Sequence, residues 1–552
     1  MVPQGSLGLR CLCPLAQRNF HISAGTFGGI PTHTTIPPQP TDPNAAPTYV
    51  GYLAGAINAI LAKTAAASQV LGLTSESEGP EKPVVTETSE SGAPTKAQVL
   101  KRTFEKRVSR TEVTSKTRAL VKKILLAESS SAKLLRIQEL SAHIISFPPT
   151  RIIAAQHPRL FAELLSAVTS NEVSAEHRAE ARQCLTLCGC QPPVKSRGSQ
   201  FELDDTYCRS VLGVNLLSID GGGTRGMMGL EVLEQLERVS GKKICELFDH
   251  VVGVSTGSII SSLLIGKGYS VEECREICEL FDHVVGVSTG SIISSLLIGK
   301  GYSVEECREV YVDTIGEELT IIETSKAVVP RLSIVAAIVN SPVLQPYIFR
   351  NYEAPAGRDS HYRGSTGQYL WKAIQASAAA PLYFEEVKVD QYLLQDGGVI
   401  ANNPTAIGVH EAKLLWPEER LHCVVSIGNG RSVCDLEQEQ SMTPSALSSL
   451  QKFNRIVDSA TNTEVVHMCM HDLLDQNVYF RLNPYMSFPY GLDEIDPKKL
   501  DQMQKDAKLY VRRNMSKIED AAARLLQKPT IIQRGVRRFE QWMDERGMYS
   551  PR

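Results

Sequence analysis

Residues 214–226, Val-Asn-Leu-Leu-Ser-Ile-Asp-Gly-Gly-Gly-Thr-Arg-Gly, decide the fold of this 552-residue chain. The first six residues form a nearly continuous apolar run, as expected for a strand buried on both faces of a parallel sheet. Glycines follow, and apolar residues then recur with helical period at Met227, Leu230 and Leu233. A strand, a glycine turn and a helix start predict an anion site, because amides at a helix N-terminus point to where negative charge will develop.

The next feature along the chain is an exact repeat, in which residues 244–276 recur unchanged as residues 277–309. Each copy contains Gly-Val-Ser-Thr-Gly, a nucleophile-elbow pattern that lifts a serine hydroxyl to the edge of a sheet. The chain therefore offers two candidate nucleophiles, Ser255 and Ser288. Two copies are too few for a solenoid. We interpret the repeat as a recent duplication or an exon counted twice, and a real extra strand–helix unit is the alternative.

Chain order favours Ser255 as the nucleophile. It follows the glycine turn after one helix and one strand, which fits a compact βαβ unit. Placing Ser288 at the same position would require the first copy to be expelled from the fold as an insertion.

A candidate base follows further along the chain. Residues 392–395, Tyr-Leu-Leu-Gln, lead into Asp396, Gly397 and Gly398. A carboxylate at a strand end beside glycines is well placed to reach a serine on a neighbouring strand, although Asp-Gly-Gly alone is an ordinary turn signal.

Two other interpretations remain open on the motifs alone. The histidines after Asp396 keep the Ser…Asp…His order of an α/β-hydrolase possible; they are His410, His422, His467 and His471. The glycines of residues 221–226 also fit a dinucleotide fingerprint. That fingerprint wants an acidic residue at the end of the second strand, whereas the second strand here ends in the elbow.

The three motifs together carry a resemblance. The ordered set Asp-Gly-Gly-Gly-x-x-Gly, Gly-x-Ser-x-Gly and Asp-Gly-Gly resembles the patatin-like phospholipase family. Residues 349–352, 376–381 and 400–404 are similar to its calcium-independent, gamma-type members. The resemblance runs from about residue 211 to the C-terminal helices. It implies a three-layer α/β sandwich with a mostly parallel sheet.

The resemblance also implies a function. The chain would be a lipid acyl hydrolase that cleaves fatty acyl esters of glycerophospholipids with a Ser–Asp dyad. The implied site comprises the nucleophile Ser255, or Ser288 in the second copy, the base Asp396, the oxyanion amides of Gly221, Gly222 and Gly223, and Arg225 and Gly226 beside them. No metal or other cofactor is implied, since amides rather than Ca²⁺ would hold the oxyanion. The alternative is a catalytically impaired lipid-surface binding or regulatory protein on the same fold, because the segment after residue 310 is shorter than the family pattern.

Composition and punctuation divide the chain into five parts. These are a targeting-like leader (1–48), an apolar segment with a disordered linker (49–98), a helical module (99–195), the patatin-like domain (211–430) and a C-terminal helical region (431–552). Residues 75–95 are rich in Ser, Glu, Thr, Pro and Gly, which is typical of a disordered linker. Prolines at residues 148–149 and 192–193 interrupt helical patterning. A stripe of Leu500, Met503, Ala507 and Tyr510 predicts a C-terminal helix packed on the domain.

Charge and targeting signals bear on partners and location. The net charge of −3 offers no basic excess for nucleic acid. No acidic residue precedes Asp42, and Arg10 and Arg18 lie in that stretch, a pattern typical of a mitochondrial transit peptide. Residues 49–62 are too short to span a bilayer. We therefore expect a peripheral membrane protein of mitochondria that acts on phospholipid, with the peroxisomal or endoplasmic reticulum membrane as alternatives. The sequence does not indicate an oligomeric state.

Overall fold

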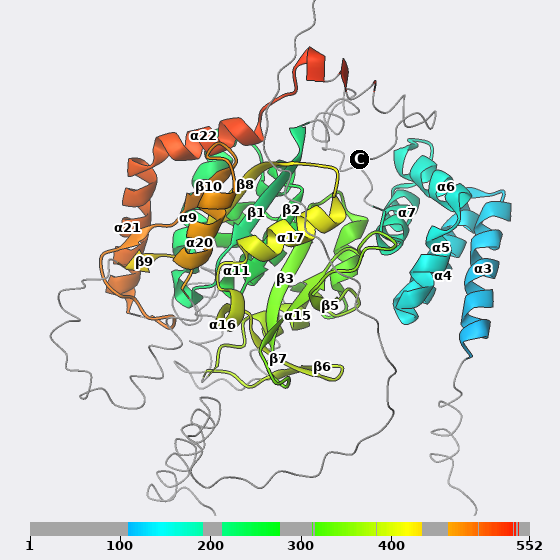
Figure 1. Ribbon diagram of the computed structural model, residues 1–552, viewed down its shortest axis with the longest axis horizontal. Helices are drawn as coiled ribbons and strands as arrows, with labels where there is room; N and C mark the ends of the chain where they lie inside the picture. Colours follow the sequence, from blue (N-terminus) through cyan, green and yellow to red (C-terminus); the bar gives the residue numbers. More distant parts are fainter. Residues whose placement is uncertain are drawn as a thin grey trace, which may run out of the picture. The chain divides into compact units, whose positions relative to one another are not determined.

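A computed structural model describes most of the chain after residue 108 (Figure 1). The described residues are 109–190, 212–275, 312, 315–381, 383–432, 462–494, 496–533, 535–536 and 539. The predicted leader and linker lie outside them, and so does the second copy of the repeat with Ser288.

The predicted helical module is present within residues 109–190. Its helices are α3 (Arg110–Leu126), α4 (Ser130–Ser146), α5 (Arg151–Ala155), α6 (Pro158–Thr169) and α7 (Ala175–Leu187), with a 3-10 turn, η1 (Pro148–Thr150), between α4 and α5. Ser109, Ser129 and Ser174 each precede a helix and accept a hydrogen bond from one of its first amides, which satisfies a donor that the helix cannot pair itself. The expected break at the two prolines is confirmed.

The centre of the larger domain is a nine-stranded sheet in the order β10-β8-β1-β2-β3-β4-β5, with β7 and β6 branching from β3. The strands are β1 (Val214–Ile219), β2 (His250–Val254), β3 (Arg331–Ile338), β4 (Gln345–Arg350), β5 (Arg363–Ser365), β6 (Val387–Val389), β7 (Tyr392–Asp396), β8 (Leu421–Ile427) and β10 (Tyr479–Leu482). The five strands from β10 to β3 are parallel, whereas β4 and β7 run antiparallel to β3. A separate ladder pairs β9 (Arg431–Ser432) with β11 (Tyr485–Met486).

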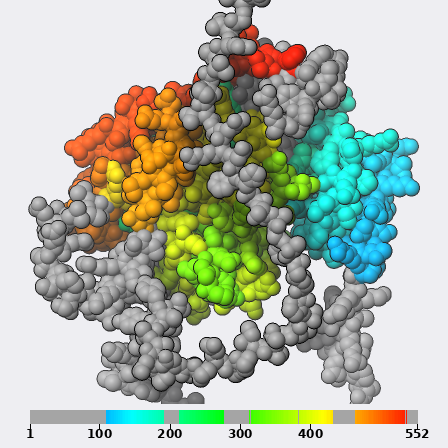
Figure 2. Space-filling model, viewed as in Figure 1, coloured from blue at the N-terminus to red at the C-terminus, as the bar shows by residue number. Residues whose placement is uncertain are grey.

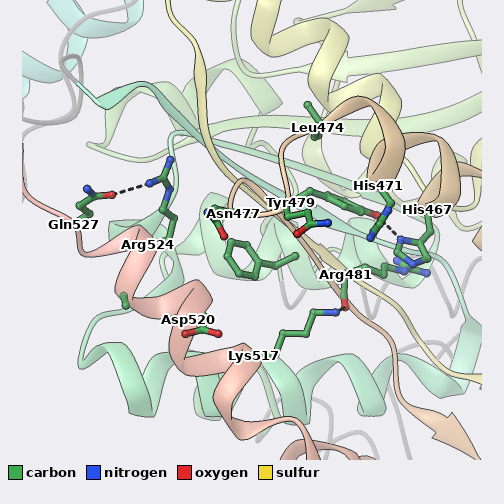
Figure 3. A pocket seen from close by; sticks show the side chains of 13 residues that line it. His467, His471, Leu474, Asn477, Tyr479, Arg481, Lys517, Asp520, Arg524 and Gln527 are labelled. Carbon is green, nitrogen blue, oxygen red and sulfur yellow. Dashed lines mark hydrogen bonds between the residues drawn. The ribbon is translucent and has the colours of Figure 1, made fainter.

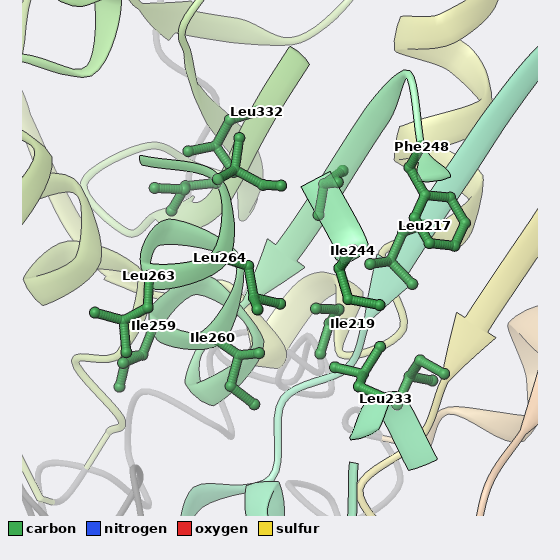
Figure 4. Packing of buried hydrophobic residues seen from close by; sticks show 14 of the residues in the cluster. Leu217, Ile219, Leu233, Ile244, Phe248, Ile259, Ile260, Leu263, Leu264 and Leu332 are labelled. Atoms are coloured by element: carbon green, nitrogen blue, oxygen red, sulfur yellow. The ribbon is translucent and has the colours of Figure 1, made fainter. Parts of the chain in front are cut away.

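Helices cover both faces of this sheet. They are η2 (Gly223–Arg225), α9 (Gly226–Ser240), α10 (Ile244–Leu247), α11 (Thr256–Ser261), a π-helical turn η3 (Ser262–Lys267), η5 (Ile321–Lys326), α15 (Leu370–Ser377), α16 (Gly398–Ala401), α17 (Thr405–Leu415), α20 (Glu464–Leu473), α21 (Pro497–Arg513) and α22 (Met515–Leu525). On one face, Leu217 of β1 packs with Leu233 and Ile260 (Figure 4). On the other face, Leu216 packs with Ile407 and Met470. Alternate residues of one strand thus face two helical layers, and the predicted three-layer α/β sandwich is confirmed.

The C-terminal part differs from the prediction in one respect. Residues 431–552 were predicted to be helical, but this region also supplies β10, which pairs in parallel with β8. The strand is short and contains Arg481, so its sequence lacks the apolar run or alternation that marks a strand. The predicted stripe on α21 is buried as expected: Leu500, Met503, Ala507 and Tyr510 all face inward.

The helical module contacts the larger domain through α7 and η5. Arg182 donates to the carbonyl of Lys326 at 2.5 Å, and the Lys326 ammonium lies 3.0 Å from the Glu180 carboxylate. Ile322 of η5 joins the apolar cluster of the module. In the space-filling view the blue-to-cyan module adjoins the green part of the domain (Figure 2).

Candidate active site

The register of β3 brings two strand ends together. The last residue of β2, Val254, pairs with Val335, and the last residue of β7, Asp396, pairs with Ala336. Both strands lie on the side of β3 opposite β4 and run in opposite directions. Their carboxyl ends therefore meet, and the residue after β2, Ser255, faces Asp396.

The two side chains are in direct contact. Ser255 Oγ donates to Asp396 Oδ2 at 2.6 Å, and the other carboxylate oxygen accepts from the Gly398 amide at 2.6 Å. Burial raises the pKa of Asp396 to about 6, against the opposing effect of these two hydrogen bonds. A carboxylate with this pKa can accept a proton near neutral pH.

Ser255 occupies a strained turn between β2 and α11. Its φ is 53° and its ψ is −124°, a backbone conformation that costs a non-glycine residue about 1–3 kcal/mol. Ser377 holds it there, since its hydroxyl accepts from the Ser255 amide at 3.0 Å and donates to the Val335 carbonyl at 2.5 Å. Gly257 allows the close approach of helix and strand, because a Cβ there would lie 2.3 Å from the Ile219 oxygen. This is the geometry of a nucleophile elbow.

The glycine loop lies directly against the elbow. The Thr256 hydroxyl donates to the Gly223 carbonyl at 2.8 Å, and a Cβ on Gly221 would lie 3.0 Å from the Cβ of Ser255. The Gly221 amide donates to the carbonyl of Asn402 at 3.1 Å, so it is engaged within the protein. The amides of Gly222 and Gly223 have no partner among the described residues.

Arg225 and Gly226 complete this loop. The Arg225 guanidinium donates through Nε to the Gly222 carbonyl at 3.2 Å, and Gly226 begins α9. The contact fixes the loop from outside; a role for Arg225 toward headgroups stays a prediction.

A buried ion pair supports the start of the loop. Asp220, fully buried, lies 2.6 Å from a guanidinium nitrogen of Arg481 on β10. Burial raises the pKa of Asp220 to about 6, and Arg481 opposes this. The Asn429 side chain also donates to the Asp220 carbonyl at 2.6 Å. Sequence reasoning missed Arg481, Asn429 and Ser377, although Asn429 lies in a Gly-Asn-Gly turn after a predicted strand.

Comparison with known proteins agrees with this arrangement. Residues 217–279 and 310–409 match the family model described as patatin-like phospholipase. The α/β domain belongs to the patatin-like phospholipase family. The match omits residues 280–309, which make up most of the second copy of the repeat. The family pattern therefore has room for one elbow, and the first copy supplies it in the patatin-like domain.

Several curated proteins are similar over a longer stretch. The chain is 33% identical to human calcium-independent phospholipase A2-gamma over 433 residues, covering 78% of this chain and 53% of that protein. It is 29% identical to phospholipase A I of Arabidopsis thaliana over 371 residues, covering 57% of this chain and 28% of that protein. The chain thus spans about half the length of the gamma-type relatives it matches.

The histidines that follow Asp396 lie elsewhere in the patatin-like domain. His410 packs on the rings of His361 and Tyr362, and His422 bonds to the Arg524 carbonyl at 2.9 Å. His467 contacts the Tyr479 hydroxyl, and His471 packs on His467. Within the described part of the chain, no histidine hydrogen-bonds to Ser255 or Asp396, so a histidine triad is not formed there.

The glycine loop allows a direct test of backbone geometry. Gly223 has φ +58°, and a Cβ there would lie 2.0 Å from the Leu492 oxygen. Gly223→Ala is expected to lower the free energy of unfolding by about 2–4 kcal/mol, from left-handed strain and a backbone clash together. Gly241 is the matched control: its φ is +66° and it has nothing within 4 Å, so Gly241→Ala adds only the strain of about 1 kcal/mol. Equal losses in urea denaturation of the two variants would contradict the packing described here.

Proposed function

We propose that the patatin-like domain of this chain hydrolyses fatty acyl esters of glycerophospholipids. The observation that carries the proposal is the 2.6 Å contact between Ser255 Oγ and Asp396 Oδ2 at a strained elbow. Unpaired amides of the glycine loop lie beside it. The substrate class is supported by the relatives, which are named phospholipases.

In the first half of the proposed reaction, Ser255 Oγ attacks the acyl carbonyl carbon as Asp396 takes its proton. The oxyanion that forms is stabilised by amides of the glycine loop, of which Gly222 and Gly223 are available. Such donors contribute about 3–4 kcal/mol each to transition-state stabilisation. The protonated Asp396 then gives its proton to the departing lysophospholipid oxygen, which leaves an acyl ester on Ser255.

In the second half, Asp396 takes a proton from water, whose oxygen attacks the acyl ester. The same amides hold the second oxyanion. Collapse of this intermediate returns the proton to Ser255 Oγ and releases the fatty acid, so one carboxylate serves as base and acid in both halves.

Labelling with a fluorophosphonate probe tests the proposal against its alternative. An activated serine forms a covalent adduct with the probe, and an inert one does not. We expect an adduct at Ser255, located by peptide mass spectrometry. A protein that folds and binds lipid but forms no adduct would instead be a lipid-surface binding or regulatory protein.

We also propose that the domain meets its substrate at a membrane surface. Tyr485, Phe488 and Leu492 are 51%, 60% and 38% exposed. They adjoin the glycine loop, because the Leu492 carbonyl accepts from the Thr224 amide at 2.9 Å. Aromatic side chains of this kind favour the boundary between water and lipid. Among the described helices, none has both the length and the apolarity to cross a bilayer.

Phe488→Ala is expected to reduce hydrolysis of phospholipid vesicles about tenfold, since burying a phenylalanine contributes about 1.5–3 kcal/mol. Hydrolysis of a soluble short-chain ester should be unchanged, because Phe488 does not contact the dyad. Leu126→Ala is the matched control: Leu126 is 69% exposed on the helical module. An equal loss on both substrates would contradict a role in membrane contact.

A further inference from the structure

A pocket of about 680 Å³ opens beyond the edge strand β10, between α20 and α22 (Figure 3). Its volume lies in the range typical of small-molecule sites. None of the residues that line it belongs to the dyad or the glycine loop. The charged and titratable groups in its wall are His467, His471, Arg481, Lys517, Arg524 and one carboxylate, Asp520.

Two of the cations in this wall lack a neutralising partner. The Lys517 ammonium donates to the Arg481 carbonyl at 2.8 Å, and no carboxylate among the described residues pairs with it. Arg524 donates to neutral oxygens only: the His422 carbonyl at 3.0 Å and the Gln527 side chain at 2.9 Å. Figure 3 shows Lys517 and Arg524 on the same helix, α22, on the side that faces the pocket. The pocket therefore carries excess positive charge.

The other cations do not relieve this excess. Arg481 is already paired with Asp220 and Glu464. Partial burial, and then the positive charges of Arg431 and Arg481, lower the pKa of Lys517. A lysine is affected in this way where the surrounding potential is positive.

We infer that this pocket binds a phosphate group, with Lys517 and Arg524 as its ligands. A phosphate carries up to two negative charges, which matches the two unneutralised cations. The flat guanidinium offers paired donors to phosphate oxygens, and the ammonium adds a point charge. Asn477 and Gln527 supply neutral polar contacts for the remainder of the ligand. The phosphate belongs either to a soluble phosphate ester or to a phospholipid headgroup.

Calorimetric titration of the full chain with glycerol 3-phosphate tests the soluble source. The Ser255→Ala background is used, so the result does not depend on whether the chain is a hydrolase. Lys517→Met is expected to weaken binding about tenfold, as for loss of one charge-assisted hydrogen bond. Lys505→Met is the control, because Lys505 is an exposed lysine on α21 outside the pocket. Asp520→Asn removes the one carboxylate and should strengthen binding.

Flotation with phosphatidylcholine vesicles, with and without phosphatidic acid, tests the headgroup source. Capture that requires phosphatidic acid and is lost in Lys517→Met, with no binding of glycerol 3-phosphate, would assign the pocket to a lipid headgroup. Equal behaviour of Lys517→Met and Lys505→Met, or no binding in either experiment, would overturn the inference.

Discussion

Replacing Ser255 with alanine is expected to lower the rate of phospholipid hydrolysis by about 10⁴-fold or more, as in other enzymes that lose a serine nucleophile. The hydroxyl that would attack the ester lies 2.6 Å from Asp396, and alanine removes it without changing the strand around it. The measurement is release of fatty acid from vesicles, with thermal denaturation to show that the variant is folded.

Ser288→Ala is the matched control for this experiment, and it should keep the full rate. The strand of the first copy, β2, already fills the place between β1 and β3. The family match also omits most of the second copy. Loss of activity in Ser288→Ala with retention in Ser255→Ala would make the second copy the working one.

The second large effect concerns Asp396. Asp396→Asn should lower hydrolysis by about 10³–10⁴-fold, since the amide cannot accept the serine proton. The wild-type protein should also lose activity in acid. The pKa of Asp396 is raised by burial to about 6, so the base is ionised above that pH and protonated below it. The rate is therefore expected to rise through pH 6 and level off above pH 7.

A pH–rate profile on a soluble ester checks this sign. Asp220 also has a pKa of about 6 through burial, so tryptophan fluorescence over the same range is needed to separate a structural change from loss of the base. A rate that stays constant from pH 5 to pH 8 in a folded protein would remove Asp396 from the mechanism.

Much of this site could be predicted from sequence because its signals are local. The strand that ends at Ile219, the glycine turn and the Gly-x-Ser-x-Gly elbow each depend on a few neighbouring residues. The chemical types of Ser255 and Asp396, in their order along the chain, were enough to suggest a dyad. Helix breaks at proline and the apolar stripe of α21 follow from the same short-range periodicity.

The supporting residues could not be predicted in this way. Ser377 reaches the Ser255 amide, and Arg481 reaches Asp220, across more than a hundred positions. Neither residue lies in a distinctive motif. The engagement of the Gly221 amide by Asn402 likewise depends on where a distant turn is placed.

The amino-acid sequence by itself determined the elements, the fold family and the two groups that would carry the chemistry, because side-chain type and short-range spacing decide these. Only the tertiary structure decided that Ser255 meets Asp396. That contact arises because neighbouring residues of β3, Val335 and Ala336, pair with the ends of two different strands. Strand register is a property of the assembled sheet, set by packing on both faces at once, and no single segment of the chain contains it.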